Sequence, residues 1–270
     1  MNPPVNEFKR RLLAGERQVG IFATMADTSL VELLAARGFD WIVIDTEHAP
    51  TDPAGVLDRL RVLDAAHAEA IVRPTWNDPV LVKRLLDIGA RTLLFPSIGT
   101  ADAAALAVAS TRYPPEGIRG VSGITRAAGY GRDRGYLRAA AAELCVIVQL
   151  ETAEGLANLD AIAAVPGVDA VFIGPSDLAA SMGHPGDAGH PDVQAAVDGA
   201  FARLAELGMP AGYLTLRLDE ARERVRQGIA FAGVASDTSI VQLGVDALFA
   251  ALELTPLEST PHSDRSRSTP

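Results

Sequence analysis

The sequence contains little lysine, cysteine or aromatic residue. Only two of its 24 basic residues are lysines, Lys9 and Lys83, so chemistry that needs a lysine amine has few positions to use. The single cysteine, Cys145, excludes an intrachain disulfide framework and a cysteine-based zinc module. Cys145 begins an apolar run, which predicts a small, buried side chain.

Basic charge is also in deficit. Against 24 Lys and Arg stand 34 Asp and Glu, a formal net charge of −10. Nucleic-acid binding depends on clustered basic side chains, so we expect no such partner. No apolar run approaches the ~20 residues that cross a bilayer, and the first residues lack the apolar stretch of a signal peptide. We therefore expect a cytoplasmic protein with no membrane partner.

Apolar residues are abundant and fall in short runs. They make up 48% of the chain, enough for a large core. Eight runs have strand length, and helical patterns separate them; the runs span 19–22, 41–46, 70–75, 92–96, 146–151, 170–173, 211–215 and 231–236. This alternation predicts an α/β fold, a (β/α)8 barrel. A doubly wound open sheet is the alternative, although no Rossmann glycine fingerprint follows the first run.

The expected helices carry recognisable end signals. They include 29–37 with a serine cap, 78–86 with an early proline, 102–112, 133–143, 193–207 and 218–226. We expect one barrel domain over residues 1–254 and a disordered tail over 255–270, which is rich in Ser, Thr and Pro. The loop over 113–135 has no role that the sequence reveals.

Ionisable residues gather where four predicted strands end. Asp45 and His48 follow the second run, Arg73 ends the third, Glu151 ends the fifth and Asp177 follows the sixth. In a barrel these positions share the face that carries active sites. Each residue also has a structural alternative: Asp45 or Asp177 as a helix cap, Arg73 in an ion pair, and His48 in an ordinary hydrogen bond.

Glu151 and Asp177 suggest a metal site. Two carboxylates without cysteine or paired histidine favour a hard cation such as Mg²⁺ or Mn²⁺. Gly174 and Pro175 would let the main chain approach a bound ligand closely. A chelating 2-oxo acid would suit the open coordination positions.

The remaining histidines are weaker candidates. His184 and His190 lie in a loop rich in Gly and Pro, where we favour a structural role over metal binding. His67 follows a helical run and is expected at the surface, and His262 falls in the tail.

Six segments of the chain form a recognisable set. They are GFDWIVIDTEH (38–48), VRP (72–74), LLDIGA (85–90), YPPEGIRG (113–120), QLET (149–152) and GVDAVFIGPSDL (167–178). In their order and spacing they resemble the HpcH/HpaI family of metal-dependent class II pyruvate aldolases. The likeness covers about residues 6–250 and is closest to the 4-hydroxy-2-oxoheptanedioate and 2-dehydro-3-deoxy-sugar-acid aldolases.

The resemblance implies a barrel of the phosphoenolpyruvate/pyruvate type, assembled as a hexamer (a trimer of dimers) with the last helix exchanged between subunits. It implies that Glu151 and Asp177 bind Mg²⁺, Mn²⁺ or Co²⁺, with no organic cofactor. The remaining implied roles are proton acceptance by His48, transition-state stabilisation by Arg73, and substrate binding by Gln149 and the main chain at Ser176.

The resemblance also gives Asp87 a role. It matches a carboxylate that a neighbouring subunit supplies to the histidine, whereas the residues alone would pair Asp45 with His48. We favour Asp87, with Asp45 in support.

The implied reaction is reversible cleavage of a 4-hydroxy-2-oxo acid to pyruvate and an aldehyde through a metal-stabilised pyruvate enolate. Neither Lys9 nor Lys83 lies at a predicted strand end, which argues against imine chemistry. Two other functions stay open: a related metal-dependent lyase acting on a CoA thioester or phosphoenolpyruvate-like substrate, and a non-catalytic barrel that binds a small acid.

Overall fold

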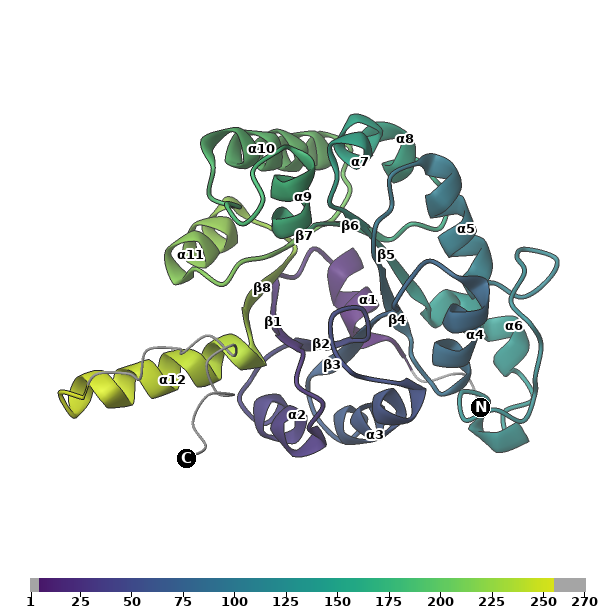
Figure 1. Cartoon of the computed structure of the whole chain (residues 1–270). Helices are drawn as coiled ribbons and strands as arrows, with labels where there is room; N and C mark the ends of the chain where they lie inside the picture. Colours follow the sequence, from purple (N-terminus) through teal and green to yellow (C-terminus); the bar gives the residue numbers. More distant parts are fainter. Residues whose placement is uncertain (1–4, 255–270) are drawn as a thin grey trace, which may run out of the picture.

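The chain folds into a closed barrel of eight parallel strands. The structure is a computed structural model that describes residues 5–254, and Figure 1 shows the strands as a ring with helices around it. The predicted barrel is therefore confirmed over the open sheet. The strands are β1 Gln18–Ala23, β2 Trp41–Asp45, β3 Glu69–Arg73, β4 Thr92–Phe95, β5 Cys145–Leu150, β6 Ala170–Ile173, β7 Ala211–Leu214 and β8 Phe231–Ser236.

Helices follow the strands in alternation, as predicted. They are α1 Glu7–Leu13, α2 Thr28–Ala35, α3 Pro53–Leu63, α4 Pro79–Asp87, α5 Ala101–Thr111, α6 Tyr136–Glu143, α7 Ala153–Ala157, α8 Leu159–Ala163, α9 Pro175–Ser181, α10 Pro191–Glu206, α11 Leu218–Gln227 and α12 Asp237–Ala251. A short 3₁₀ turn, Gly129–Gly131, lies in the long β4–β5 connection.

Several predicted boundaries were wrong by a few residues. The serine cap expected for α2 is replaced by Asp27, whose carboxylate accepts the Leu30 N–H at 3.0 Å and starts the helix earlier. α6 begins at Tyr136 rather than at residue 133. β2 and β3 stop sooner than expected because their last paired residues are Asp45 and Arg73.

The inside of the barrel is filled by large apolar side chains on alternate strand positions. These form one cluster with Phe8 and Leu12 of α1, which closes the end where the strands begin; in Figure 1 α1 lies within the ring. Gly20 makes room for the Trp41 ring, since a Cβ on Gly20 would lie 2.0 Å from Trp41 Cδ2. Cys145 is buried in this cluster, as predicted.

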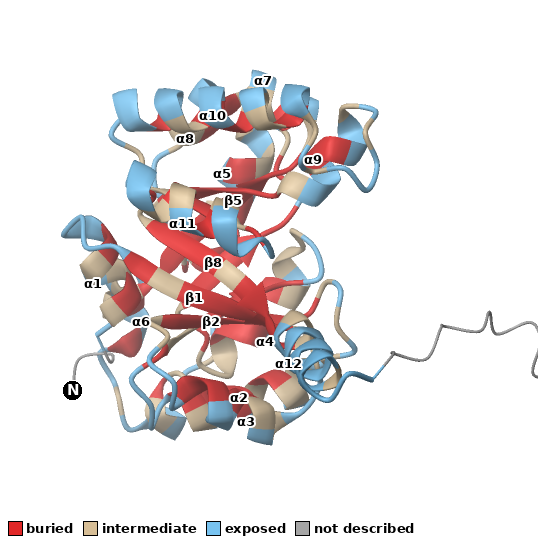
Figure 2. Cartoon of the chain, turned by 90° about the vertical axis from the view of Figure 1, so that its left-hand side faces the viewer, coloured by how far each residue is buried: buried red, intermediate tan, exposed pale blue. Residues whose placement is uncertain are grey.

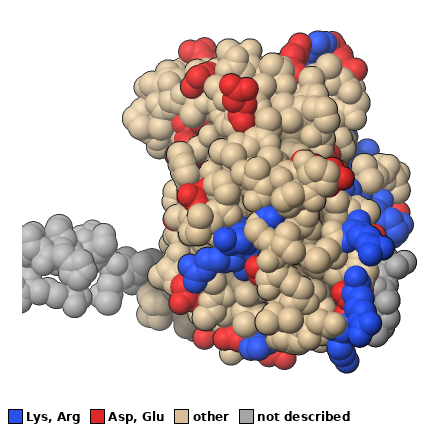
Figure 3. Space-filling view, turned by 90° about the vertical axis from the view of Figure 1, so that its right-hand side faces the viewer, with Lys and Arg blue, Asp and Glu red and all other residues tan. Residues whose placement is uncertain are grey.

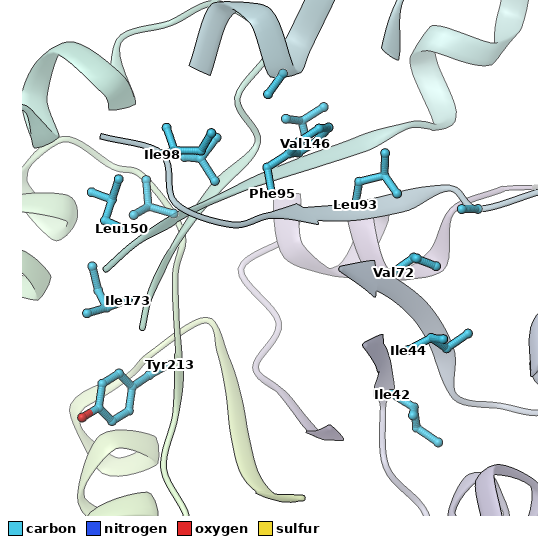
Figure 4. Close-up of a cluster of buried hydrophobic side chains, with 14 of the residues drawn as sticks. Ile42, Ile44, Val72, Leu93, Phe95, Ile98, Val146, Leu150, Ile173 and Tyr213 are labelled. Carbon is cyan, nitrogen blue, oxygen red and sulfur yellow. The ribbon is translucent and has the colours of Figure 1, made fainter. Parts of the chain in front are cut away.

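A second and larger cluster packs between the barrel and its helices. Figure 4 shows its strand residues, among them Ile42, Ile44, Val72 and Leu93, pointing outward from successive strands. Strands buried on both faces explain why their sequences read as continuous apolar runs.

The last helix departs from this pattern. α12 extends away from the barrel in Figure 1 and is pale blue, hence exposed, in Figure 2. Its start is anchored because the buried Asp237 carboxylate accepts the Thr24 and Met25 N–H groups at 3.0 and 2.8 Å. Beyond that point large apolar side chains face outward, between 39% and 63% exposed along the helix; they are Ile240, Val241, Leu243, Val245 and Leu248.

Charged side chains of both signs lie on the surface. Figure 3 shows separate groups of basic and acidic side chains on one face, with other residues between them. None of the helices within residues 5–254 is long and apolar enough to cross a membrane. The predicted tail, residues 255–270, and His262 within it lie outside the described residues.

Candidate functional site

Polar residues gather at the end of the barrel where the strands stop, because alternate residues of each strand point into the barrel. Val43, Ile71 and Ile147 belong to the inner cluster. The residues two positions further along the same strands are polar: Asp45, Arg73 and Gln149. Their side chains therefore also point into the barrel. All three are buried. The predicted gathering of ionisable residues at one end of the barrel is therefore what the topology produces.

Asp45 and Arg73 occupy paired positions of β2 and β3, and their side chains form a bidentate ion pair. Arg73 Nε donates to Asp45 Oδ1 at 2.9 Å and Nη2 donates to Oδ2 at 2.7 Å. Asp45 is fully buried, and the Arg73 guanidinium also lies over the Phe22 ring, 5.4 Å from its centroid. Asp45 holds Arg73 through both oxygens, and within residues 5–254 it makes no ion pair or hydrogen bond with His48. Its pairing with His48, inferred from their nearness in sequence, is not what this chain shows.

Glu47 connects this pair to His48. Its Oε2 lies 3.1 Å from Arg73 Nη1 and 3.7 Å from His48 Nε2. Burial raises the pKa of Glu47, and the neighbouring Arg73 opposes that rise. The His48 side chain is 61% exposed, so it faces the open end of the barrel. Glu47 was not among the predicted site residues, although its place between Asp45 and His48 was a signal.

Glu151 is a second buried carboxylate of the cluster. Its Oε1 accepts the Ser97 N–H at 2.6 Å and the Ser97 hydroxyl at 3.1 Å, and its Oε2 accepts from Gln149 Nε2. Burial raises the pKa of Glu151; the Ser97 N–H opposes the rise, and the negative charge of Asp177 adds to it. Two carboxylates that disfavour each other's charge suit a shared cation.

Ser97 was missed as a site residue. It follows β4 and has φ 54°, the left-handed region that non-glycine residues seldom adopt. This conformation accompanies the contact of both its N–H and its hydroxyl with Glu151.

Gly174 leaves the space that Glu151 occupies. A Cβ at Gly174 would lie 2.7 Å from Glu151 Oε2 and 2.8 Å from Gln149 Nε2. Gly174 precedes α9, whose first residues are Pro175 and Ser176, with Asp177 in the first turn. No side chain caps α9, so Asp177 is not the helix cap that was the alternative for it.

Gln149 Oε1 is buried beside these carboxylates and has no hydrogen-bond partner among residues 5–254. Glu47 Oε2 is also buried, and its contacts are the ion pairs with Arg73 and His48. An unpartnered buried oxygen such as that of Gln149 costs free energy unless a ligand, water or cation meets it. Together with Glu151 and Asp177 these oxygens make an all-oxygen environment, which fits a hard divalent cation rather than a thiophilic one.

Asp87 lies elsewhere in its own chain. It ends α4 and pairs with Arg119, whose Nη2 donates to Asp87 Oδ1 at 2.8 Å. The Arg119 side chain is fully buried, with its guanidinium over the Tyr113 ring at 4.5 Å and near Tyr136 at 5.9 Å. Asp87 has no ion pair or hydrogen bond to His48 within residues 5–254. The YPPEGIRG segment thus has a structural role: it brings a buried arginine to the end of α4.

The two lysines are both outside the site. Lys9 Nζ lies 3.0 Å from Asp169 Oδ1 and donates to the Leu144 carbonyl at 2.7 Å, at the end of the barrel that α1 closes. Lys83 lies within α4. Neither stands at the end of a strand, which agrees with the prediction.

Sequence and structure comparisons give the family. The family model described as HpcH/HpaI aldolase/citrate lyase matches residues 18–242. The chain is 48% identical over 250 residues to a "Pyruvate aldolase" of Rhizobium etli, covering 93% of this chain and 98% of that one. It is 45% identical over 246 residues to a "4-hydroxy-2-oxo-heptane-1,7-dioate aldolase" of Salmonella dublin, covering 91% and 94%.

A solved structure agrees with these relatives. The crystal structure of an HpcH/HpaI aldolase/citrate lyase family protein from Burkholderia cenocepacia J2315 superposes with a TM-score of 0.89 at 42% identity, covering 92% of this chain and all of that one. The barrel, the order of its strands and the matched length are those of one family. This chain belongs to the HpcH/HpaI aldolase/citrate lyase family.

Proposed function

We propose that the protein is a pyruvate aldolase that cleaves 4-hydroxy-2-oxo acids reversibly to pyruvate and an aldehyde, with a divalent cation as cofactor. The observation that carries the proposal is the continuous cluster of Asp45, Arg73, Glu47 and His48 beside Glu151 at one barrel opening. The Rhizobium and Salmonella relatives, named as aldolases of this kind, support it over about nine tenths of the chain.

Glu151 and Asp177 would hold the cation, which is Mg²⁺, Mn²⁺ or Co²⁺. When bound, the cation supplies Lewis-acid stabilisation of negative charge on the 2-oxo oxygen of the substrate. The Ser97 contacts hold Glu151 Oε1, so the carboxylate is oriented before any ligand arrives. Asp177 stands in the first turn of α9, where helix geometry fixes its direction.

Arg73 stabilises the charge that develops on the substrate. The pair with Asp45 and the contact with Phe22 hold the guanidinium in one place, so little reorganisation is needed. A fixed guanidinium donates charge-assisted hydrogen bonds to an oxyanion. Gln149 and the main chain at Gly174, Pro175 and Ser176 complete the surface for the pyruvate half.

His48 takes the proton from the C4 hydroxyl. The C3–C4 bond then breaks, the aldehyde leaves, and the electron pair forms the enolate of pyruvate, which gains a proton at C3. His48 suits this task because its side chain is exposed to the open end of the barrel, and histidine is the side chain that most often serves as a general base. Glu47 is its neighbour within the chain, and Asp87 of a neighbouring subunit holds the imidazole from outside.

The contribution of a neighbouring subunit rests on α12. Its exposed apolar side chains pack against other copies in a hexamer, a trimer of dimers in which this last helix is exchanged. Mixing His48→Ala with Asp87→Asn protein, followed by subunit exchange, should restore activity at sites that combine two intact residues. No recovery in verified mixed oligomers would place both residues of each site in the same chain.

The function is tested with a panel of 4-hydroxy-2-oxo acids, with pyruvate detected through lactate dehydrogenase, before and after removal of metal by EDTA. Cleavage that stops with EDTA and returns with Mn²⁺ or Mg²⁺ is expected. Activity that survives complete chelation would refute the cation. Turnover of malyl-CoA-type thioesters, with none of the 4-hydroxy-2-oxo acids cleaved, would show that the protein is a thioester lyase and not an aldolase. Trapping of a pyruvate adduct by borohydride on Lys9 or Lys83 would refute the mechanism.

A further inference from the structure

Arg59 is a buried arginine that takes no part in the proposed mechanism. It lies in α3 and is 1% exposed. Within residues 5–254 its guanidinium makes no ion pair: Nη1 donates to the Thr51 hydroxyl at 3.2 Å, Nη2 donates to the Met25 carbonyl at 3.2 Å, and Nε has no partner. Burial lowers the pKa of Arg59, and the negative charges of Asp237 and Asp27 oppose that fall. A buried cation that bonds only neutral acceptors costs free energy, so the packing of α3 alone does not account for an arginine here.

Both partners of Arg59 belong to loops at the open end of the barrel. Met25 follows β1, and Thr51 lies in the segment that joins β2 to α3. In Figure 1 the helices that follow these two strands, α2 and α3, lie side by side. Arg59 therefore ties together two neighbouring loops at the end where the polar residues gather.

The segment between β2 and α3, residues 46–52, carries His48 and contains neither helix nor strand. Its start is fixed to β3, because the Thr46 N–H and hydroxyl donate to the Arg73 carbonyl at 3.1 and 2.7 Å. Near its other end the Thr51 hydroxyl accepts the hydrogen bond from α3. His48 lies between these two attachments.

The position of the His48 imidazole depends on the path of this segment. Within residues 5–254 no hydrogen bond holds the imidazole, and the carboxylate of Glu47 is 3.7 Å away. The place of the ring therefore follows that of its backbone. Arg73 and Glu151 differ in this respect, because each is held by hydrogen bonds of its own side chain. Loss of the attachment at Thr51 would release His48 and leave those two groups in place.

We propose that Arg59 is a positioning residue for the cleavage reaction, which fixes the segment that carries His48 by binding Thr51 and Met25 together. The inference rests on the proposed function, in which His48 takes the proton, and adds to it a residue that touches no substrate. Asp237 supports the same arrangement from the start of α12. Its carboxylate accepts the Met25 N–H at 2.8 Å, while Arg59 binds the Met25 carbonyl.

Two substitutions break the contact in different ways. Arg59→Met removes the buried cation, and Thr51→Val removes only the hydroxyl that accepts from it. Thr111→Val is the matched control, because the Thr111 hydroxyl donates to the Val108 carbonyl at 2.8 Å within α5. Arg59→Met should keep or raise the Tm, since an apolar replacement of a buried charge is often neutral or stabilising. A loss of activity in this variant would then not reflect a loss of folding.

Steady-state cleavage and amide hydrogen exchange give two separate measurements on the native protein. We expect the kcat of Arg59→Met to fall by about 10²-fold, the loss that a misplacement of about 1 Å produces. KM and Mn²⁺ affinity should stay unchanged, because the groups that hold the pyruvate half are not disturbed. Thr51→Val should lower kcat by a smaller factor, and the double variant should lose no more than Arg59→Met, since both changes break one contact. Exchange in residues 46–52, measured by mass spectrometry, should be faster in both variants and unchanged in Thr111→Val.

Either of two results would overturn the proposal. Unchanged exchange in Arg59→Met and Thr51→Val would show that Arg59 does not hold the segment. Faster exchange with an unchanged kcat would limit Arg59 to a structural role. Exchange is measured without substrate, so an absence of cleavage by the wild-type protein would refute the proposed function, and the exchange rates would still decide whether Arg59 fixes residues 46–52.

Discussion

Replacing Gly174 by alanine tests the geometry of the candidate site with the smallest change. An added Cβ would lie 2.7 Å from Glu151 Oε2, 2.8 Å from Gln149 Nε2 and 2.9 Å from Glu151 Cβ. Gly174 has φ −93°, which alanine adopts freely, so the substitution acts through contact and not through backbone strain.

The expected loss of cleavage rate follows from how far Glu151 must move to make room for the added Cβ. Ordinary contacts of a Cβ begin at 3.4 Å, so the carboxylate must move by about 0.7 Å, and Ser97 holds its other oxygen. A displacement near 1 Å at a reacting centre costs about 10²-fold in rate. We expect kcat/KM to fall by about that factor, Mn²⁺ affinity to fall with it, and stability to drop by about 1–3 kcal/mol from overpacking.

Gly199→Ala is the matched control. Gly199 lies in α10 with nothing within 4 Å of its added Cβ, so alanine should stabilise the helix by about 0.5–1 kcal/mol and leave cleavage unchanged. Steady-state cleavage rates, Mn²⁺ titration and urea unfolding of the two variants are compared. Wild-type rate and Mn²⁺ affinity in Gly174→Ala would refute the tight fit against Glu151 and the assignment built on it.

Three further outcomes are expected. Arg73→Met leaves the buried Asp45 unpaired, so urea unfolding should show that the free energy of unfolding falls by about 3–5 kcal/mol. Adding Asp45→Asn should restore stability but not cleavage, and restored cleavage would show that Arg73 has only a structural role. Burial raises the pKa of Glu151, so protonation should displace Mn²⁺ at a higher pH than it would from an ordinary carboxylate; displacement seen by electron paramagnetic resonance only in the usual carboxyl range would contradict this. Burial raises the pKa of Cys145 well above its usual value, so iodoacetamide should modify it only after unfolding, and rapid modification of the native protein would disprove its enclosure.

Local patterns were sufficient for the elements of the barrel. Each strand is a short apolar run, and each was located to within two residues because such a run needs no distant partner to be recognised. Boundaries failed where a neighbour decided them: Asp27 rather than a serine starts α2, and β2 ends at its pairing with Arg73.

Pairings within the site were harder to predict than its members. Asp45 and His48 are close in sequence, yet Asp45 points into the barrel toward Arg73 on the next strand, whereas His48 lies beyond the strand end. Ser97 was missed because its link to Glu151 joins the ends of β4 and β5, and no local pattern shows that contact.

The sequence by itself determined the fold class, the end of the barrel that carries the polar residues, and the shortage of lysine that disfavours imine chemistry. These depend on composition and on the period of two within single strands. Only the tertiary structure decided which groups touch: Asp45 with Arg73, Glu47 with Arg73, and Ser97 with Glu151. Such contacts join segments whose spacing is set by barrel closure and loop geometry, which no single stretch of chain encodes.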